Sequence, residues 1–123
     1  MLFEFTNDEP IYRQIADTIE EGIFTGVFPE EMQIPSTTEI SAQFNINPAT
    51  VLKGMNLLVN EQLIEKKRGV GMFVVTGAKT MITEKRQTQF YDTYVQKFIK
   101  EAKNLNLSKK EILSLIERGF ENE

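Results

Sequence analysis

The stretch from residue 35 to residue 59 constrains this chain most, because it predicts two short helices joined by a tight polar turn. Ser36 and Glu39 have the spacing of a capping box, in which a hydroxyl and a carboxylate satisfy the free amides at a helix start. Asn45 favours a turn because Asn tolerates left-handed backbone geometry. Asn47, with a proline directly after it, predicts the start of a second helix. The pattern is typical of a helix-turn-helix, a unit that places its second helix in the major groove of DNA.

The second of these helices has one apolar and one polar face. Its predicted buried side repeats at helical spacing and consists of Val51, Met55, Leu58 and Val59. The opposite side is small or polar, with Ala49, Lys53, Asn56 and Asn60, and with Thr50 at its edge. The functional interpretation is that Asn47, Ala49, Thr50 and Lys53 meet DNA, and the alternative is an ordinary solvated face. Asn47 is expected to cap the helix as well.

The segments on either side complete a larger pattern. Before the pair, residues 10–25 predict a helix with Asp8 or Glu9 near its N-cap and Pro10 at its first position. After the pair, residues 62–67 and 72–75 predict the two strands of a β-hairpin around the turn at 68–71. A helix, a helix-turn-helix and a hairpin follow one another in a winged helix.

Several residues around this unit are candidates for contact with DNA. At the start of the first short helix, the hydroxyls of Ser36, Thr37 and Thr38 could reach phosphate, although Ser36 suits the cap better. In the hairpin, the candidates are Lys66, Lys67, Arg68, Gly69, Val70 and Gly71. Small residues at a wing tip allow close approach to the minor groove. The alternatives are a solvated strand edge for the lysines and an ordinary tight turn for the glycines.

Composition limits the chemistry that is possible. The chain has 123 residues, and the absence of His and Cys removes the commonest general base, the commonest zinc ligands and any disulfide. Without an apolar run near 20 residues, no transmembrane helix is expected, and the acidic N-terminus is unlike a secretory signal. We therefore expect a cytoplasmic protein that is not an enzyme and needs no metal or cofactor.

Net charge is divided unevenly along the chain. The whole chain carries −4; residues 1–77 hold five basic and eleven acidic residues, whereas residues 78–123 hold nine basic and seven acidic ones. Four of the first five basic residues lie within 53–68. A basic side can still bind phosphate, although the acidic side weakens long-range attraction to DNA.

The last part of the chain, from about Ala78, predicts two helices with more apolar surface than they can cover. One stripe runs from Ile82 to Leu105, and a second capping box at Ser108 and Glu111 begins the last helix. Unmet burial of this kind favours a symmetric homodimer. The predicted dimer residues are Tyr91, Tyr94, Val95, Phe98, Ile99, Ala102, Ile112, Leu115 and Ile116. Tyr91, Tyr94 and Phe98 could instead line a pocket for a small-molecule effector between protomers, but the dimer core is favoured.

Four separated motifs resemble those of a known family. Residues 10–15, 34–40, 47–51 and 69–74 have the order and spacing of the GntR family of bacterial transcription regulators, over about residues 9–76. The short two-helix tail is similar to that of the YtrA-like subfamily, which lacks the large effector domain of other members. The resemblance implies a homodimer that binds an inverted-repeat operator, usually as a repressor.

The chain also departs from the pattern of this family. Members commonly carry Arg where this chain has Thr38, many carry Arg at Leu52, and a Gly usually replaces Gln62. The basic residue between the wing glycines is Val70 here, while Lys53 keeps a basic position on the second helix. Several usual DNA contacts are therefore missing, and Lys66, Lys67 and Arg68 could compensate.

Together these observations predict a mainly α fold with a small β-hairpin. Residues 1–77 are expected to form a winged helix-turn-helix, and residues 78–123 a two-helix dimerisation domain. The predicted function is sequence-specific binding of double-stranded operator DNA by a homodimeric repressor, with no membrane partner. The alternative is a winged-helix module that binds other proteins and binds DNA weakly or not at all.

Overall fold

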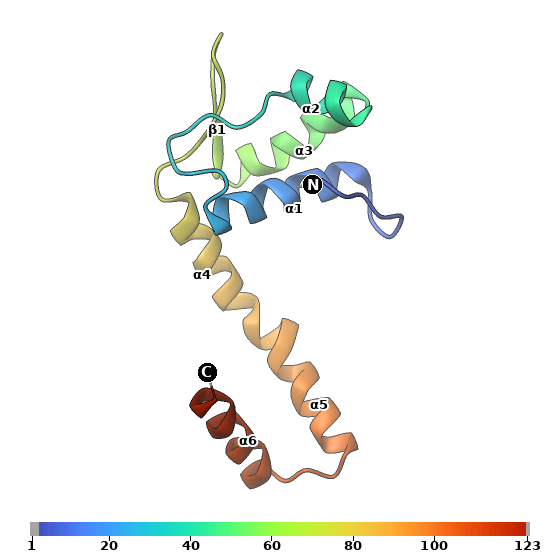
Figure 1. The fold of residues 1–123 in the computed structure, drawn as a ribbon, viewed down its shortest axis with the longest axis vertical. Helices are drawn as coiled ribbons and strands as arrows, with labels where there is room; N and C mark the ends of the chain where they lie inside the picture. Colours follow the sequence, from blue (N-terminus) through green and yellow to red (C-terminus); the bar gives the residue numbers. More distant parts are fainter. Residues whose placement is uncertain (1–2, 123) are drawn as a thin grey trace. The chain divides into compact units, whose positions relative to one another are not determined.

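In the computed structural model, which describes residues 3–122, six α-helices, two strands and one π-helical turn follow one another (Figure 1). Their order is α1 (Ile11–Thr25), α2 (Thr37–Phe44), α3 (Pro48–Asn60), β1 (Ile64–Lys67), β2 (Gly71–Val74), α4 (Ala78–Phe90), η1 (Tyr91–Val95), α5 (Gln96–Asn104) and α6 (Lys109–Glu121). The chain divides into two compact units, Met1–Glu84 and Lys85–Glu123. The predicted fold class, mainly helical with a small hairpin, is confirmed.

The core of the first unit is built around α1 and α3. Ile15 and Ile19 of α1 are fully buried in one cluster with Val51 and Met55 of α3, as the apolar spacing of both helices predicts. The two helices approach closely because of Gly54, where an added Cβ would lie 2.6 Å from the carbonyl oxygen of Tyr12.

The first turns of α4 also belong to this core. Ala78 and Ile82 are fully buried in the same cluster, so the compact unit extends to Glu84, past the boundary expected after residue 77. The Glu30 carboxylate accepts hydrogen bonds from the backbone N–H groups of Gly77, at 2.7 Å, and of Lys79, at 3.2 Å. A carboxylate at a helix start satisfies free amides and complements the helix dipole. Glu30 therefore caps α4 from the segment between α1 and α2.

The helix starts of the helix-turn-helix agree with the sequence prediction. Ser36 and Glu39 form the capping box, Asn45 has a left-handed φ of 54°, and the Asn47 side chain accepts from the Ala49 amide at 2.8 Å. The predicted start of α1 was wrong by one residue. Pro10 is the N-cap rather than the first helical residue, and no side chain caps this helix.

A buried side chain holds the segment before α1 in place of the expected cap. Gln14 donates from Nε2 to the carbonyl oxygens of Thr6, at 3.0 Å, and Glu9, at 2.7 Å. Its Oε1 accepts from the Thr6 amide at 2.8 Å. One glutamine thus satisfies three backbone groups of this segment, and a buried polar side chain has to be hydrogen-bonded in this way to be tolerated.

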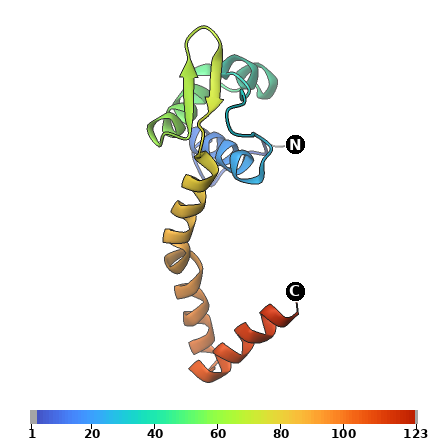
Figure 2. The same cartoon turned by 90° about the vertical axis from the view of Figure 1, so that its left-hand side faces the viewer.

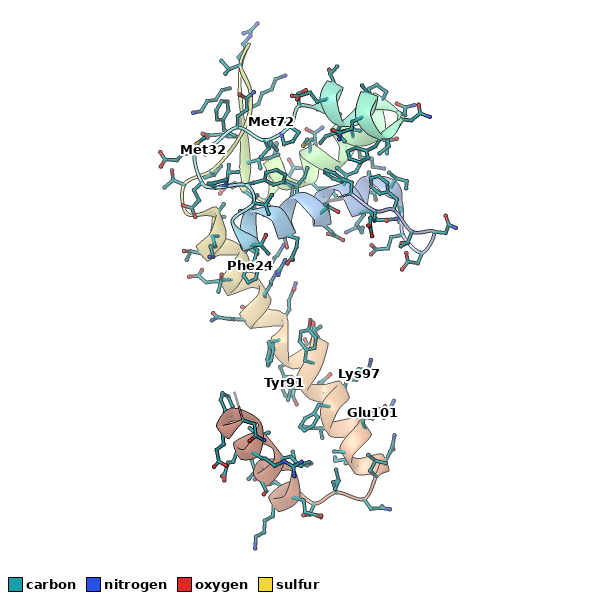
Figure 3. The ribbon with its side chains drawn as sticks, viewed as in Figure 1. Phe24, Met32, Met72, Tyr91, Lys97 and Glu101 are labelled. Carbon is teal, nitrogen blue, oxygen red and sulfur yellow. The ribbon has the colours of Figure 1, made fainter. Side chains whose placement is uncertain are left out.

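The hairpin is braced by the segment between α1 and α2. β1 and β2 pair antiparallel, with Ile64 opposite Val74 and Lys67 opposite Gly71. The Ile34 amide donates to the Met72 carbonyl at 2.9 Å, and the Val74 amide donates to the Met32 carbonyl at 3.0 Å. Met32 and Met72 are labelled in Figure 3 on these two hydrogen-bonded segments. Gln33 of this segment also pairs antiparallel with Phe73 as an isolated β bridge.

The bounds of both strands differ from the predicted ones by one or two residues. β1 begins at Ile64 rather than at residue 62, because Gln62 has a φ of 63° and cannot continue an extended strand. The tip consists of residues 68–70, and β2 begins one residue earlier than expected. The hairpin projects beyond the helices that surround its base (Figure 2).

The second unit contains the end of α4, η1, α5 and α6. Its predicted capping box is present: the Glu111 amide donates to the Ser108 hydroxyl, and the Ser108 amide donates to the Glu111 carboxylate. The hydrogen bond from the Ser108 backbone amide to the carboxylate, followed by the contribution of the Ser108 side chain, lowers the pKa of Glu111. Among the described residues, no helix combines the length and the apolar character needed to cross a membrane.

Candidate nucleic-acid interface

The exposed face of α3 carries a mixture of small, apolar and polar side chains. Ala49, Leu52, Lys53 and Asn56 are all exposed and recur at steps of three and four residues, while Val51, Met55 and Leu58 are buried on the other side. The predicted division of this helix into two faces is therefore confirmed. Leu52 was not among the predicted contacts, although the same helical count that selects Ala49 and Lys53 also places it on this face.

Lys53 lies against an aromatic ring of α1. Its ammonium nitrogen is 4.0 Å from the centre of the Tyr12 ring, within the range of a cation–π interaction. The Arg13 guanidinium is 5.8 Å from the same ring. Tyr12 thus holds the positive charge of Lys53 at the junction of α1 and α3, at one edge of the exposed face.

The start of α2 offers hydroxyl groups of two kinds. The Ser36 hydroxyl accepts from the Glu39 amide at 3.0 Å and is occupied as the cap, as the sequence suggested. Thr38 is exposed and Thr37 is half-buried. Thr38 therefore offers an accessible donor at this helix start.

The tip of the hairpin places an exposed apolar side chain between two glycines. Val70 is 62% exposed and stands between Gly69, with a φ of 77°, and Gly71, with a φ of 143°. The Gln33 amide donates from Nε2 to the Val70 carbonyl at 3.0 Å. A Cβ at position 71 would lie 2.4 Å from the same Nε2 atom. Gly71 therefore serves both the left-handed backbone and the close approach of Gln33, which braces the tip.

The two lysines of β1 point to opposite faces of the hairpin, because side chains alternate along a strand. Lys66 pairs with Met72, and Lys67 pairs with Gly71. The Lys67 ammonium lies 4.3 Å from the centre of the Phe73 ring. Lys66 and Lys67 therefore do not form one basic pair, and each could meet phosphate only from its own face. Arg68, at the tip, is exposed.

Comparison with known proteins identifies this arrangement. The family model described as bacterial regulatory proteins of the gntR family matches residues 11–74, from the start of α1 to the end of β2. This chain belongs to the GntR family. It is 32% identical over 90 residues to the HTH-type transcriptional repressor YtrA of Bacillus subtilis (strain 168), a match that covers 73% of this chain and 69% of the relative.

Solved structures support the same assignment. A GntR-family regulator from Bacteroides thetaiotaomicron is 36% identical, with a TM-score of 0.72 over 91% of this chain and 97% of the other. The DNA-binding domain of AraR, solved in complex with operator ORX1, is 27% identical, with a TM-score of 0.55 over 58% of this chain and 93% of that domain. This GntR-family chain is therefore a DNA-binding transcriptional regulator, and the family and its relatives are regulators rather than enzymes.

The structure brings the predicted contacts together on one unit. The start of α2, the exposed face of α3 and the hairpin all belong to Met1–Glu84, and the hairpin extends past α3 on the side away from α1 (Figure 1). Sequence reasoning missed Tyr12, Gln33 and Leu52. The contacts of Tyr12 and Gln33 reach residues 41 and 37 positions away, so no local pattern indicates them.

Proposed function

We propose that the protein is a homodimeric repressor that binds an inverted-repeat operator, with α3 in the major groove and the hairpin tip at the minor groove. The observation that carries this proposal is the exposed face of α3 beside a projecting, braced hairpin, in a domain that resembles the operator-bound domain of AraR. The B. subtilis relative is named a repressor. A regulator of this kind acts where the genome is, so a cytoplasmic location follows from the proposal.

The proposed contacts divide into positioning and reading roles. Phosphate would be met by Thr37, Thr38, Lys66 and Arg68, and by Lys67 from the other face of the hairpin. The base edges would be met by the first turns of α3, where Asn47, Ala49, Thr50 and Lys53 lie. The part of the tip formed by Gly69, Val70 and Gly71 suits the minor groove, since its side chains are small.

The second unit supports the proposed dimer. A groove of about 730 Å³ lies within it, and its lining is apolar apart from Lys103 and Lys109. Phe98, Leu113 and Ile116 line this groove and remain more than a third exposed. A soluble chain rarely leaves so many large apolar side chains together in water, and the same surface on a second copy would cover them symmetrically.

Not every predicted dimer residue is available for that contact. Tyr94, Val95, Ile99 and Ile112 line the groove, and Tyr91 and Leu115 are exposed. Ala102 is buried inside its own unit. We therefore expect Ala102 to support the two-helix hairpin from within rather than to meet the partner.

Selection of binding sites from random duplex DNA by the full chain tests the function. The expected result is an enriched inverted repeat that binds two chains, measured by light scattering of the complex. Enrichment of a single unrepeated half-site, or a complex that contains one chain, would overturn the proposal that the protein binds DNA as a homodimer. Absence of any enriched sequence would overturn specific DNA binding and leave the interaction module as the function.

The charges near the interface give that second function a specific basis. Lys53 and Lys67 both rest on aromatic rings of the same chain, and residues 1–77 carry six more acidic than basic residues. Lys53 either contacts DNA phosphate or stays outside the DNA contact, and the salt dependence of binding distinguishes these two possibilities. If its ammonium meets phosphate, Lys53→Ala lowers the slope of log K against log salt by about one, whereas an unchanged slope would place Lys53 outside the DNA contact.

A further inference from the structure

The centre of the exposed α3 face is apolar rather than charged. Leu52 is 45% exposed, and Ala49, three residues before it, is also exposed. The neighbouring cation, Lys53, is drawn to the edge of the face by the Tyr12 ring. Leu52 belongs neither to the buried core nor to the apolar side chains packed against that core, and it lies in the half of the helix that faces bases in a helix-turn-helix.

We propose that Leu52, together with Ala49, reads the 5-methyl groups of thymine in the major groove. This inference rests on the proposed function, because it assigns a specificity to the helix that the proposal places in the groove. Thymine carries the one methyl group among the four base edges of the major groove, and apolar side chains are its natural partners. The Leu52 side chain can neither donate nor accept a hydrogen bond, so it cannot bind the hydrogen-bond donors and acceptors on those base edges.

The spacing of the two residues fits neighbouring base pairs. Residues three apart lie on the same helix face and are separated by about 4.5 Å along the axis. Successive base pairs are about 3.4 Å apart along each strand. Ala49 and Leu52 can therefore face adjacent base pairs, and the expected half-site contains one or two adjacent thymines, on either strand, opposite this part of α3.

The test replaces thymine by deoxyuridine, which removes the methyl group and leaves base pairing unchanged. The probe is the operator obtained by selection, with each thymine of both half-sites exchanged in turn. For the unaltered protein we expect the dissociation constant to rise about fourfold per contacted methyl, the factor that corresponds to burial of one CH2 group. Thymines outside the contact should be indifferent to the exchange.

Variants of Leu52 assign the effect to this side chain. Leu52→Ala should bind the thymine operator more weakly and lose its sensitivity to deoxyuridine at the contacted position. Leu52→Arg should move the preferred base there from thymine to guanine, since Arg can bind guanine with two hydrogen bonds. Val27→Ala, an exposed apolar residue outside the helix-turn-helix, is the matched control and should retain the full deoxyuridine effect.

The outcomes separate this inference from the function on which it rests. If no exchange of thymine for deoxyuridine changes the dissociation constant for the selected operator, the inference is overturned and the proposed function stays intact. A deoxyuridine effect that persists unchanged in Leu52→Ala would assign the methyl contact to another residue and also overturn it. Failure to select any operator would overturn the proposed function itself.

Discussion

The two units of this chain bury their apolar side chains to different degrees. In the winged helix, Ile15, Ile19, Ile40 and Ile64 are fully or almost fully buried in one continuous core. In the second unit, Ala102 is the one buried apolar residue among those described. The large side chains of that unit stay exposed, including Phe90, Tyr91, Tyr94, Phe98, Leu105, Leu113, Leu115, Ile116 and Phe120.

This difference indicates that the winged helix is stable by itself, whereas the second unit needs association to cover its apolar side chains. A core of fully buried branched side chains stabilises the winged helix without help from another molecule. The second unit is shorter than about 40 residues, a size at which association is usually needed for stability. We therefore expect changes in the winged helix to act on folding at any protein concentration, and changes in the second unit to act through association.

The largest expected effect comes from the core of the winged helix. Ile15→Ala removes a fully buried side chain and should lower the free energy of unfolding by roughly 2–5 kcal/mol. Urea unfolding followed by circular dichroism at two protein concentrations measures it. The loss should be the same at both concentrations, and a loss that vanishes at the higher one would contradict the separation of the two units.

The next effect concerns the apolar groove of the second unit. Phe98→Ala removes a ring that lines this groove, and should raise the dimer dissociation constant by about 30-fold or more, as truncation at an interface hot spot does. Sedimentation equilibrium gives the constant. The control is Lys97→Ala, because Lys97 lies with Glu101 on the side of the helix away from α6 (Figure 3).

Equal association of both variants would contradict the proposed role of the groove. An unfolding midpoint of the winged helix that falls with Phe98→Ala at high dilution would do so too, since this ring then would support folding rather than pairing.

Local signals in the sequence account for most of the fold. The two capping boxes, at Ser36 and Ser108, and the cap at Asn47 were all predicted correctly, because each depends on residues within a few positions of one another. The start of α1 was predicted wrongly because neither Asp8 nor Glu9 caps the helix. Gln14, inside the helix, instead holds the preceding segment by donating to the carbonyl oxygens of Thr6 and Glu9.

The candidate site was less visible because its geometry depends on distant partners. The sequence shows where Lys53 lies on α3, but not that Tyr12 of α1 holds its charge. It shows Gly71 as a turn residue, but not that Gln33 occupies the space of a Cβ there. Fold prediction uses periodicity, whereas these positions are set by contacts between elements.

Substitution of one glycine in each unit by alanine tests the difference in packing between the winged helix and the second unit. Gly54→Ala places a Cβ 2.6 Å from the backbone oxygen of Tyr12 and should destabilise the winged helix by about 1–3 kcal/mol. Gly119→Ala, within α6, meets no atom within 4 Å and should stabilise that helix by roughly 1 kcal/mol. Thermal unfolding measures both changes. Changes of the same sign would show that the two glycines do not differ in packing as the structure indicates.

The smallest expected effect lies at two left-handed residues, one in each unit. Gln62, with a φ of 63°, and Asn106, with a φ of 60°, adopt a conformation that glycine enters without steric cost. Gln62→Gly should stabilise the winged helix by about 0.5–1 kcal/mol, since relief of this conformation exceeds the entropy that glycine adds to the unfolded chain.

Asn106→Gly should give a smaller gain, because Asn already tolerates left-handed geometry. The control is Gln43→Gly in α2, where the residue is exposed and helical, and where glycine should destabilise by roughly 1 kcal/mol. A loss of stability in Gln62→Gly would mean that the side chain contributes more than its backbone conformation costs. The gain in Gln62→Gly should be independent of protein concentration, whereas any gain in Asn106→Gly should be seen as tighter association.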